Sequence, residues 1–196
     1  MRPKDQTKYD AIINTSLELV KKLGFTGISI SKIAKQANIS PATIYIHFKN
    51  REDLFTKLYK KIRTDMSNGA LLGVNDAMDI EHIFKSIWIN SFSYNLNHPD
   101  YLIYREKFEQ TPMMENIKPE YFELYNYVNT LFQRGIKEHF IKDLPIPFLA
   151  SFAFIPIITL LNFHFEGVIN MDENHITEAC NIAWNTIKIS DYQLND

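Results

Sequence analysis

The sequence is poor in the residues that hold disulfide-bonded and metal-bound proteins together. It has a single cysteine, Cys180, among 196 residues. An internal disulfide framework is therefore excluded, and a reducing cytoplasm is the expected compartment. The residues His164, His175 and Cys180 lack the spacing of a zinc site, so we assign them to structure or to solvent. A serine elbow, a phosphate loop and a paired-carboxylate motif are also absent from the sequence, which predicts no metal, no cofactor and no enzymatic activity.

Long apolar runs are scarce as well. The one membrane-like stretch runs from Phe148 to Phe165 without a charged residue, which is barely long enough to cross a bilayer. It contains Pro156 and Asn162, and a helix buried in an interface explains the same composition. Polar and basic residues fill positions 2 to 10, where a secretion signal would need an apolar segment. We therefore expect neither membrane insertion nor a secretion signal.

Charge of both signs is present, but it is unevenly distributed. Residues 1–63 carry 13 Lys and Arg against 5 Asp and Glu, whereas residues 64–196 carry 8 against 18. A basic segment suits a nucleic acid partner, although a solvated basic surface would have the same composition. The pattern favours a DNA-binding first third followed by an acidic remainder with a different role.

Apolar residues recur at helical spacing along the whole chain, without the alternation of strands and without internal repeats. Asn50 and Asp53 are expected to form a capping box, Asp79 is expected to cap the following helix, and Pro156 should bend or break a later one. The sequence therefore predicts an all-α fold. The expected helices, about nine, cover residues 5–23, 29–36, 41–47, 50–68, 80–96, 99–110, 119–140, 147–165 and 173–189.

Residues 29–49 predict two short helices joined by a tight turn. The first helix has an apolar face of small and branched side chains, which allows another helix to approach closely. Asn38 tolerates the left-handed backbone conformation that a turn of three to four residues needs. The apolar face is formed by Ile30, Ile33, Ala34 and Ala37.

The second of these helices is expected to begin after Ser40. Serine is a good N-cap, and Pro41 occupies the first helical position, where its missing N–H is not needed. Ile44 and Phe48 are four residues apart and face the first helix. The other side chains are free to meet a partner, which is the arrangement of a DNA-reading helix-turn-helix. These side chains are Ala42, Thr43, Tyr45, Ile46 and His47.

The segment from Ile33 to Leu54 resembles the signature of the TetR/AcrR transcriptional regulators. Most positions match that family's pattern, I-A-x-x-A-G-V-S-x-x-T-L-Y-x-H-F-x-S-K-E-x-L. The resemblance implies a three-helix DNA-binding domain over residues 1–48, a connecting helix from residue 50, and a helical effector-binding and dimerisation domain over residues 49–196. The departures from the pattern are Asn38 for Gly, Ile39 for Val, Ile44 for Leu, Asn50 for Ser and Arg51 for Lys.

The resemblance and the charge together imply a double-stranded DNA operator as partner. Base reading is expected from the first turn and outer face of the 41–47 helix, and phosphate contacts from lysine, arginine, hydroxyl groups and helix N-termini. Ala42 and the methyl group of Thr43 suit thymine, and His47 suits phosphate. Core packing is the alternative for Tyr45. The predicted DNA-binding residues are Ser29, Ser40, Pro41, Ala42, Thr43, Tyr45, His47, Lys49 and Arg51.

The acidic remainder holds 20 aromatic residues, most of which must form an ordinary core. The segment from Ile87 to Pro99 resembles multidrug-responsive members of the family of the RamR type, which implies that Trp88 faces an effector cavity. Negative charge beside aromatic rings favours an apolar or cationic effector. Plain core packing is the alternative for every residue of this set. The predicted ligand-binding residues are Phe84, Trp88, Ser91, Phe92, Tyr104, Tyr125, Ser151, Phe154 and Ile155.

The family's dimer interface lies in the last two helices, so the resemblance implies a homodimer formed through them. Its two reading helices would then lie about 34 Å apart and match a palindromic site. We expect a cytoplasmic dimeric repressor that a small hydrophobic ligand releases from its operator. The alternative is a ligand-independent DNA-bound dimer that serves as a protein-interaction platform. A closed aromatic cavity would favour the repressor, and a solid core with an exposed apolar patch would favour the platform.

Overall fold

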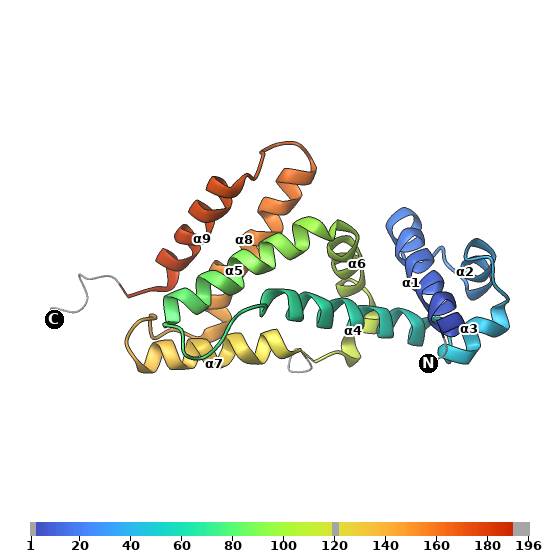
Figure 1. Cartoon of the computed structure of the whole chain (residues 1–196), viewed down its shortest axis with the longest axis horizontal. Coiled ribbons are helices and arrows are strands. Elements are labelled where there is room, and N and C mark those ends of the chain that lie inside the picture. Colours follow the sequence, from blue (N-terminus) through green and yellow to red (C-terminus); the bar gives the residue numbers. More distant parts are fainter. Residues whose placement is uncertain (1–2, 119–121, 190–196) are drawn as a thin grey trace. The chain divides into compact units, whose positions relative to one another are not determined.

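The computed structural model describes residues 3–118 and 122–189, and most of these residues lie in helices (Figure 1). Nine α-helices and one 3-10 helix lie within these ranges, so the all-α prediction is confirmed. The elements are α1 (Pro3–Leu23), α2 (Ile30–Gln36), α3 (Pro41–His47), α4 (Arg51–Ala70), α5 (Ile80–Asn97), α6 (Pro99–Glu109), η1 (Pro112–Asn116), α7 (Glu123–Lys137), α8 (Ile146–Phe165) and α9 (Glu173–Ile187).

The helices pack into two compact units. The first holds the described residues up to Asp65 together with His98–Lys118, and the second holds Met66–Asn97 together with the described residues from 122 onward. Helix α4 therefore contributes residues to both units. Helix α6 follows α5 in the sequence but packs with the N-terminal helices in the first unit. The functional division after residue 48 stays a prediction, because packing and function divide a chain by different criteria.

An aromatic core joins α4 to α6 in the first unit. The hydroxyl group of Tyr104 on α6 is buried and donates a hydrogen bond of 2.9 Å to the backbone oxygen of Phe55 on α4. The ring of Phe25 lies edge-on to Phe55, Tyr104 and Phe108, with ring centroids 5.0 to 5.7 Å apart. Edge-to-face pairs of this kind add to the free energy gained by burying the rings. The core therefore fixes α6 to the helix that follows the helix-turn-helix.

Polar contacts at Glu109 reinforce this junction. Its carboxylate accepts hydrogen bonds from the Tyr59 hydroxyl at 2.9 Å and from Arg63 at 3.2 Å, and Nε of Arg105 lies 3.5 Å away. Burial raises the pKa of Tyr59 to about 12, so this hydroxyl group remains a donor at every physiological pH. A charged acceptor bound by several donors holds α4 and α6 at a fixed distance.

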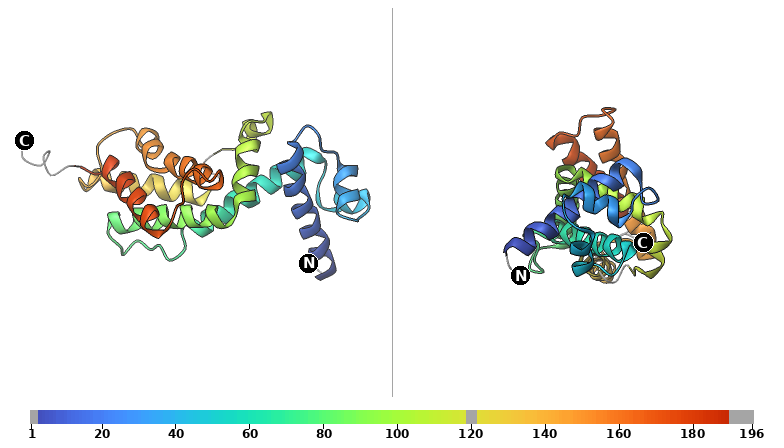
Figure 2. Two further views of the ribbon diagram at one scale, coloured as in Figure 1. Left: turned by 90° about the horizontal axis from the view of Figure 1, so that it is seen from above. Right: turned by 90° about the vertical axis from the view of Figure 1, so that its right-hand side faces the viewer.

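The core of the second unit is built from α5, α7, α8 and α9. The ring of Phe84 on α5 contacts Phe132, Phe154 and Trp184, one from each of the other three helices, with centroids 5.3 to 6.4 Å apart. Nε1 of the fully buried Trp88 donates a 2.8 Å hydrogen bond to a backbone oxygen of α8. This bond satisfies the only polar atom of the indole, so the ring can be buried at little cost. Figures 1 and 2 show α8 and α9 side by side.

Most helix boundaries follow the sequence, and the exceptions have physical causes. Helix α7 begins at Glu123, the expected start over residues 119–121 lies outside the described residues, and the helix ends at Lys137, before the left-handed His139. Helix α9 ends at Ile187 instead of 189 because Lys188 is extended and forms a β-bridge with Ile141. At Pro156 the sequence predicted a bend or a break; the break was wrong, since α8 continues through this residue, and the bend stays a prediction. A proline removes only one backbone donor, and a helix of twenty residues retains the others.

The end of α4 packs tightly against α5. Gly69 lies against the ring of Tyr94, and a Cβ atom at position 69 would come within 2.7 Å of Cγ of that ring. Nδ2 of Asn90 also donates hydrogen bonds of 3.1 and 2.9 Å to the backbone oxygens of Ala70 and Leu72. Those carbonyl groups would otherwise lack helical partners. Glycine at position 69 is therefore required by contact, although alanine would be the better helix former.

We predict that Gly69→Ala destabilises the protein by about 1 kcal/mol or more, because overpacking against the ring outweighs the gain in helix propensity. Urea denaturation would measure the free energy of unfolding. Gly27→Ala is the control, since its Cβ would have no neighbour closer than 3.5 Å and its stability should change little. A Gly69→Ala variant as stable as wild type would contradict the close contact.

Candidate DNA-binding and effector sites

The turn between α2 and α3 is formed by local hydrogen bonds. Oγ of Ser29 accepts a 3.2 Å bond from the backbone N–H of Lys32 and caps α2. Asn38 adopts a left-handed conformation with φ of 56°, as expected, and the N–H of Ile39 reaches back to the oxygen of Ala34 at 3.0 Å. The turn is therefore stabilised by backbone hydrogen bonds between residues close together in the sequence. Helix α2 buries Ile30, Ile33 and Ala34.

Helix α3 is held at its start by a cap and along one side by two apolar anchors. Oγ of Ser40 accepts a 3.3 Å bond from the N–H of Thr43 and lies 3.0 Å from the Thr43 hydroxyl oxygen. Pro41 occupies the first turn. Ile44 is fully buried and Phe48, which ends the helix, is 2% exposed. These contacts use only one face of a seven-residue helix and leave the rest open.

The open face of α3 carries large side chains. Tyr45 is 56% exposed and Ile46 is 77% exposed, so Tyr45 is not a core residue. Ala42 is also exposed, while Thr43 and His47 are half-buried. Two adjacent exposed residues of this size on so short a helix indicate a contact surface. The predicted DNA-binding set does not include Ile46. The sequence signal for this residue was its position on the outward-facing side of the 41–47 helix.

The basic residues around α3 differ in how far the fold already engages them. Lys49 and Lys35 are exposed, and their ammonium groups form no hydrogen bond or ion pair within the described part of the chain. Arg51 is half-buried and donates a 3.1 Å bond to the backbone oxygen of Ile28, which ties the start of α4 to the segment before α2. The ring of His47 lies 5.6 Å from that of Tyr9. Lys49 is therefore freer than Arg51 or His47 to move toward a phosphate.

The capping box at the start of α4 is displaced by one residue from the expected arrangement. Oδ1 of Asn50 accepts a 2.8 Å bond from the N–H of Asp53, but the Asp53 carboxylate accepts from the N–H of Lys49 and not from that of Asn50. Burial tends to raise the pKa of Asp53, but the bonds from Lys49 and Lys57 outweigh it and leave this pKa below its ordinary value. Asp53 is therefore an anion at neutral pH and links the segment after α3 to the first turn of α4.

The residues predicted to bind an effector fall into several environments. Phe84, Trp88 and Phe92 on α5 are fully buried in the second unit, where the Trp88 and Phe92 rings stack 5.7 Å apart. Phe154 is half-buried and contacts Phe84. Oγ of Ser91 is buried and has no hydrogen-bond partner among the described residues. The structure thus brings these five residues into or beside one aromatic core.

The other four predicted ligand residues lie elsewhere. Tyr125 is 42% exposed and Ile155 is 58% exposed. Oγ of Ser151 donates to the backbone oxygen of Phe148 on its own helix. Tyr104 belongs to the first unit, where its hydroxyl group is already bonded to the backbone. The role of all nine residues as ligand contacts stays a prediction.

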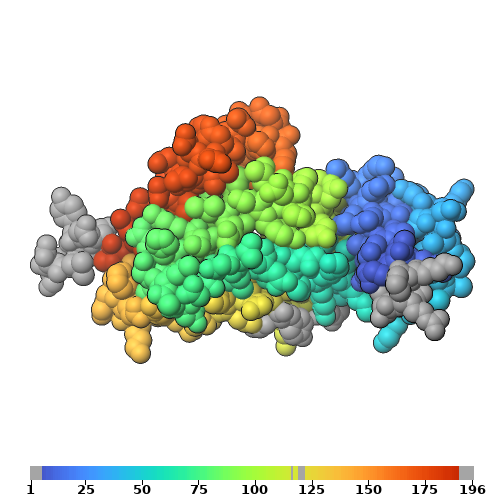
Figure 3. Space-filling model, in the orientation of Figure 1, coloured from blue at the N-terminus to red at the C-terminus, as the bar shows by residue number. Residues whose placement is uncertain are grey.

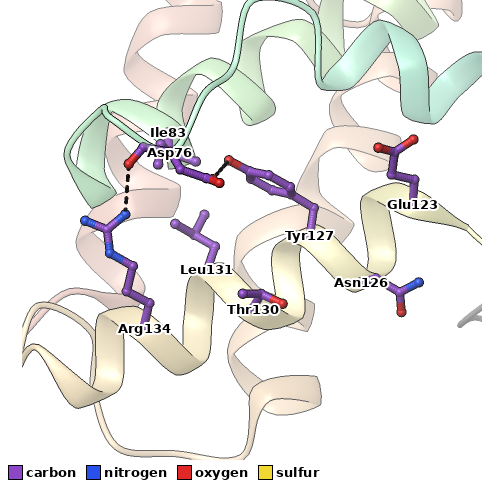
Figure 4. Close-up of a pocket in the computed structure, with 8 residues that line it drawn as sticks. All are labelled: Asp76, Ile83, Glu123, Asn126, Tyr127, Thr130, Leu131 and Arg134. Carbon is purple, nitrogen blue, oxygen red and sulfur yellow. Dashed lines mark hydrogen bonds between the residues drawn. The ribbon is translucent and has the colours of Figure 1, made fainter.

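A surface pocket of about 320 Å³ lies between α7 and the loop that follows α4 (Figure 4). Ile83 and Leu131 form its apolar base, and polar side chains of α7 form one wall. The Tyr127 hydroxyl donates a 2.7 Å bond to Asp76 of the loop. None of the nine predicted ligand residues lines this pocket. The sequence signal for this pocket was the row of polar residues that recur at helical spacing along α7.

Comparison with known proteins identifies the family. The model for bacterial regulatory proteins of the tetR family matches residues 12–58, which contain the capped helix pair. The model for the C-terminal domain of tetracyclin repressor-like proteins matches residues 80–188, more than half of the chain. This chain belongs to the TetR family of transcriptional regulators. The family resemblance and the DNA-binding class predicted from the sequence are thereby confirmed.

Individual relatives of this TetR-family chain match different parts of it. It is 43% identical over 54 residues to the fatty acid metabolism regulator protein of Bacillus subtilis (strain 168), and that match covers 28% of each chain. A TetR family transcription regulator from Marinobacter aquaeolei VT8 has a similar structure, with a TM-score of 0.87, 27% identity and coverage of 97% of this chain and 100% of that one. FadR from Bacillus subtilis in complex with stearoyl-CoA has a TM-score of 0.72 at 20% identity, covering 90% and 96%, and shares the fold. The finer resemblance to RamR-type members stays a prediction.

Helices α8 and α9 of this TetR-family chain expose an apolar surface. Phe148, Phe152 and Ile155 are each more than half exposed and share one face of α8, and Ile182 on the adjacent α9 is 64% exposed. In the space-filling view α9, in red, lies at the surface of the molecule (Figure 3). By length and composition α8 could cross a membrane, and 22% of its most apolar window is buried. Apolar patches of this kind mark an interaction surface.

We predict that Ser40→Ala lowers the free energy of unfolding by about 1 kcal/mol, because α3 loses its N-cap. Denaturation in urea would measure this loss. Ser31→Ala is the matched control, since Ser31 is an exposed serine inside α2 and caps no helix. Equal stability of the two variants would show that the Ser40 cap contributes nothing.

Proposed function

We propose that this TetR-family regulator is a dimeric repressor that reads a palindromic operator through α3 and is released by a small hydrophobic ligand. The observation that supports it best is the asymmetry of α3. Its Ile44 anchor and Ser40 cap fix the helix, and Tyr45 and Ile46 remain exposed. A rigid helix with an exposed outer face is what insertion into a major groove requires.

In this proposal the contacts divide into base reading and phosphate binding. The exposed first turn of α3 meets base edges, where Ala42 and the methyl group of Thr43 suit thymine. Tyr45 and Lys49 contact phosphates, as do the N-termini of α2 and α3. Arg51 acts mainly by holding α4 in place, because its guanidinium already donates to a backbone oxygen. The proposed DNA-binding residues are Ser29, Ser40, Pro41, Ala42, Thr43, Tyr45, His47, Lys49 and Arg51.

The dimer of the proposal uses the exposed apolar face of α8 and α9. Phe148, Phe152 and Ile155 recur at helical spacing, and α8 carries no charged residue. A second copy would cover this face by a two-fold contact in which the same residues meet on both sides. Such a dimer presents two α3 helices to one side of a duplex, about one helical turn of 34 Å apart. The dimer also explains why α8 is so apolar, because a second copy would cover the helix where a membrane otherwise would. A protein of this kind suits the cytoplasm.

The effector of the proposal acts on the second unit. Helix α4 extends covalently from the first unit into the second, so a ligand that favours one position of its last turn changes the position of α3. A related FadR structure contains stearoyl-CoA, which supports a long apolar ligand as one class to test. The tight packing of Phe84, Trp88 and Phe92 supports a second candidate, a ligand-independent dimer that recruits another protein through an apolar patch.

We predict that Tyr45→Ala weakens binding to the DNA upstream of the protein's own gene by about tenfold, because a large contact on the open face of α3 is lost. A mobility-shift titration in dilute salt would measure it. Tyr125→Ala is the matched control, an exposed tyrosine in the second unit. Unchanged affinity of Tyr45→Ala would argue against docking through α3.

We predict that Phe152→Asp converts the dimer into monomers, because each copy would then bury an unpaired carboxylate in an apolar interface. Sedimentation velocity would measure the oligomeric state. Leu72→Asp is the control, since Leu72 is 76% exposed on the loop after α4. A Phe152→Asp variant that stays dimeric would place the interface elsewhere and leave the α8 face to another protein.

A further inference from the structure

The pocket between α7 and the loop after α4 has the composition of a ligand site. Its volume of about 320 Å³ falls within the usual range for small molecules. Besides Glu123, the wall contributed by α7 consists of four side chains on the same face of the helix, three, four, seven and eleven residues further along: Asn126, Tyr127, Thr130 and Arg134. Ile83 and Leu131 beneath them are 1% and 3% exposed. The pocket is therefore an apolar base with a polar rim, which suits an amphiphilic molecule.

The charges around the rim are unequal. Asp76 and Glu123 supply two carboxylates, and Arg134 supplies the only positive charge among the described lining residues. Nε of Arg134 already forms a 2.9 Å ion pair with Glu138, and its Nη1 lies 3.5 Å from the backbone oxygen of Asp76. The guanidinium is thus neutralised by a neighbour outside the pocket. The remaining field at the rim is negative.

The two carboxylates have unused acceptor capacity. Asp76 receives the Tyr127 hydroxyl on Oδ1, and no other bond to its carboxylate is found among the described residues. Glu123, in the first turn of α7, has no hydrogen-bond or ion-pair partner in the described part of the chain. Figure 4 shows the Tyr127 ring between the Asp76 carboxylate and the Glu123 side chain, with Arg134 at the opposite end of the pocket.

The phenol ring completes the site. Burial and the bond to Asp76 raise the pKa of Tyr127 to about 12, so the ring stays neutral and keeps its hydroxyl group as a donor to the loop. The face of a neutral phenol attracts an organic cation within about 6 Å of its centre. A carboxylate on each side of such a ring adds Coulombic attraction to the cation–π contact.

We propose that this pocket binds the cationic end of an amphiphilic ammonium compound, with the ammonium group at Tyr127 between Asp76 and Glu123 and the apolar part over Ile83 and Leu131. The inference rests on the proposed ligand-controlled function. It adds that the effector is a cation and that it binds in this pocket. It favours a cation over a fatty acyl anion, because an anion would meet two carboxylates and a guanidinium that is already paired.

The test is calorimetric titration of the full-length protein, without DNA, with decyltrimethylammonium below its micellar concentration. Decylsulfonate is the anionic probe of equal chain length. We expect the cation to bind in 1:1 ratio to each chain and the anion to bind more weakly. The variants Glu123→Gln and Asp76→Asn should each weaken cation binding about three- to fivefold in dilute salt, as expected for an exposed charge pair. The asparagine retains an oxygen that can accept from Tyr127, so the loop contact is kept.

Glu173→Gln is the matched control, because Glu173 begins α9 as Glu123 begins α7 and lies outside the pocket. It should bind the cation as wild type does. Tighter binding of decylsulfonate, or wild-type cation affinity in both Glu123→Gln and Asp76→Asn, would overturn the inference. The mobility shift without ligand reports separately on DNA binding, so failure of the cation site and failure of the repressor proposal are distinguishable.

Discussion

A seven-residue helix is too short to be stable in water by itself, and the proposed DNA-reading surface depends on one of that length. Helix α3 persists because Ser40 satisfies its first turn and because Ile44 and Phe48 are buried on one side. This anchoring also determines which residues of α3 remain exposed to solvent. Tyr45 and Ile46 are exposed because the face opposite Ile44 has nothing of the same unit to pack against. Stability and recognition are thus two results of the same packing.

The first unit extends this constraint beyond the helix-turn-helix. Tyr104 and Glu109 of α6 bind the backbone and side chains of α4, so α6 is fixed to the helix that begins at Arg51. In sequence, α6 lies well inside the acidic part of the chain. The packing therefore places a segment of the second half beside the DNA-binding helices. A change in α6 would act on α4 through a buried hydroxyl bond and a shared carboxylate.

The second unit combines two kinds of apolar surface with different uses. Phe84 and Trp88 are enclosed, and the one polar atom of Trp88 is satisfied by a backbone oxygen. Phe152 and Ile155, both on α8, face outward. The first pair is stabilised within this chain alone, whereas the second pair belongs to an exposed apolar surface of the kind that marks an interaction site. This difference, more than composition, separates the core of the second unit from its exposed apolar surface.

Local chemistry determined what the sequence alone could predict. Ser40 and Asp79 cap their helices as expected, because a cap needs only a side chain and the N–H groups two or three residues later. The family signature was readable for the same reason. The ends of α7 and α9 were misplaced, since α9 stops where Lys188 pairs with Ile141, a contact between residues far apart in sequence.

Only tertiary structure could decide which aromatic residues are enclosed. Phe84 and Tyr125 are both aromatic residues near the start of a helix, yet one is fully buried and the other is 42% exposed. Helical periodicity gives the face of a residue relative to its own helix, but not which faces meet another helix. The pocket at Asp76 and Tyr127 could not be located from the sequence for this reason: the row of polar residues along α7 was readable, but only folding brings the loop against it.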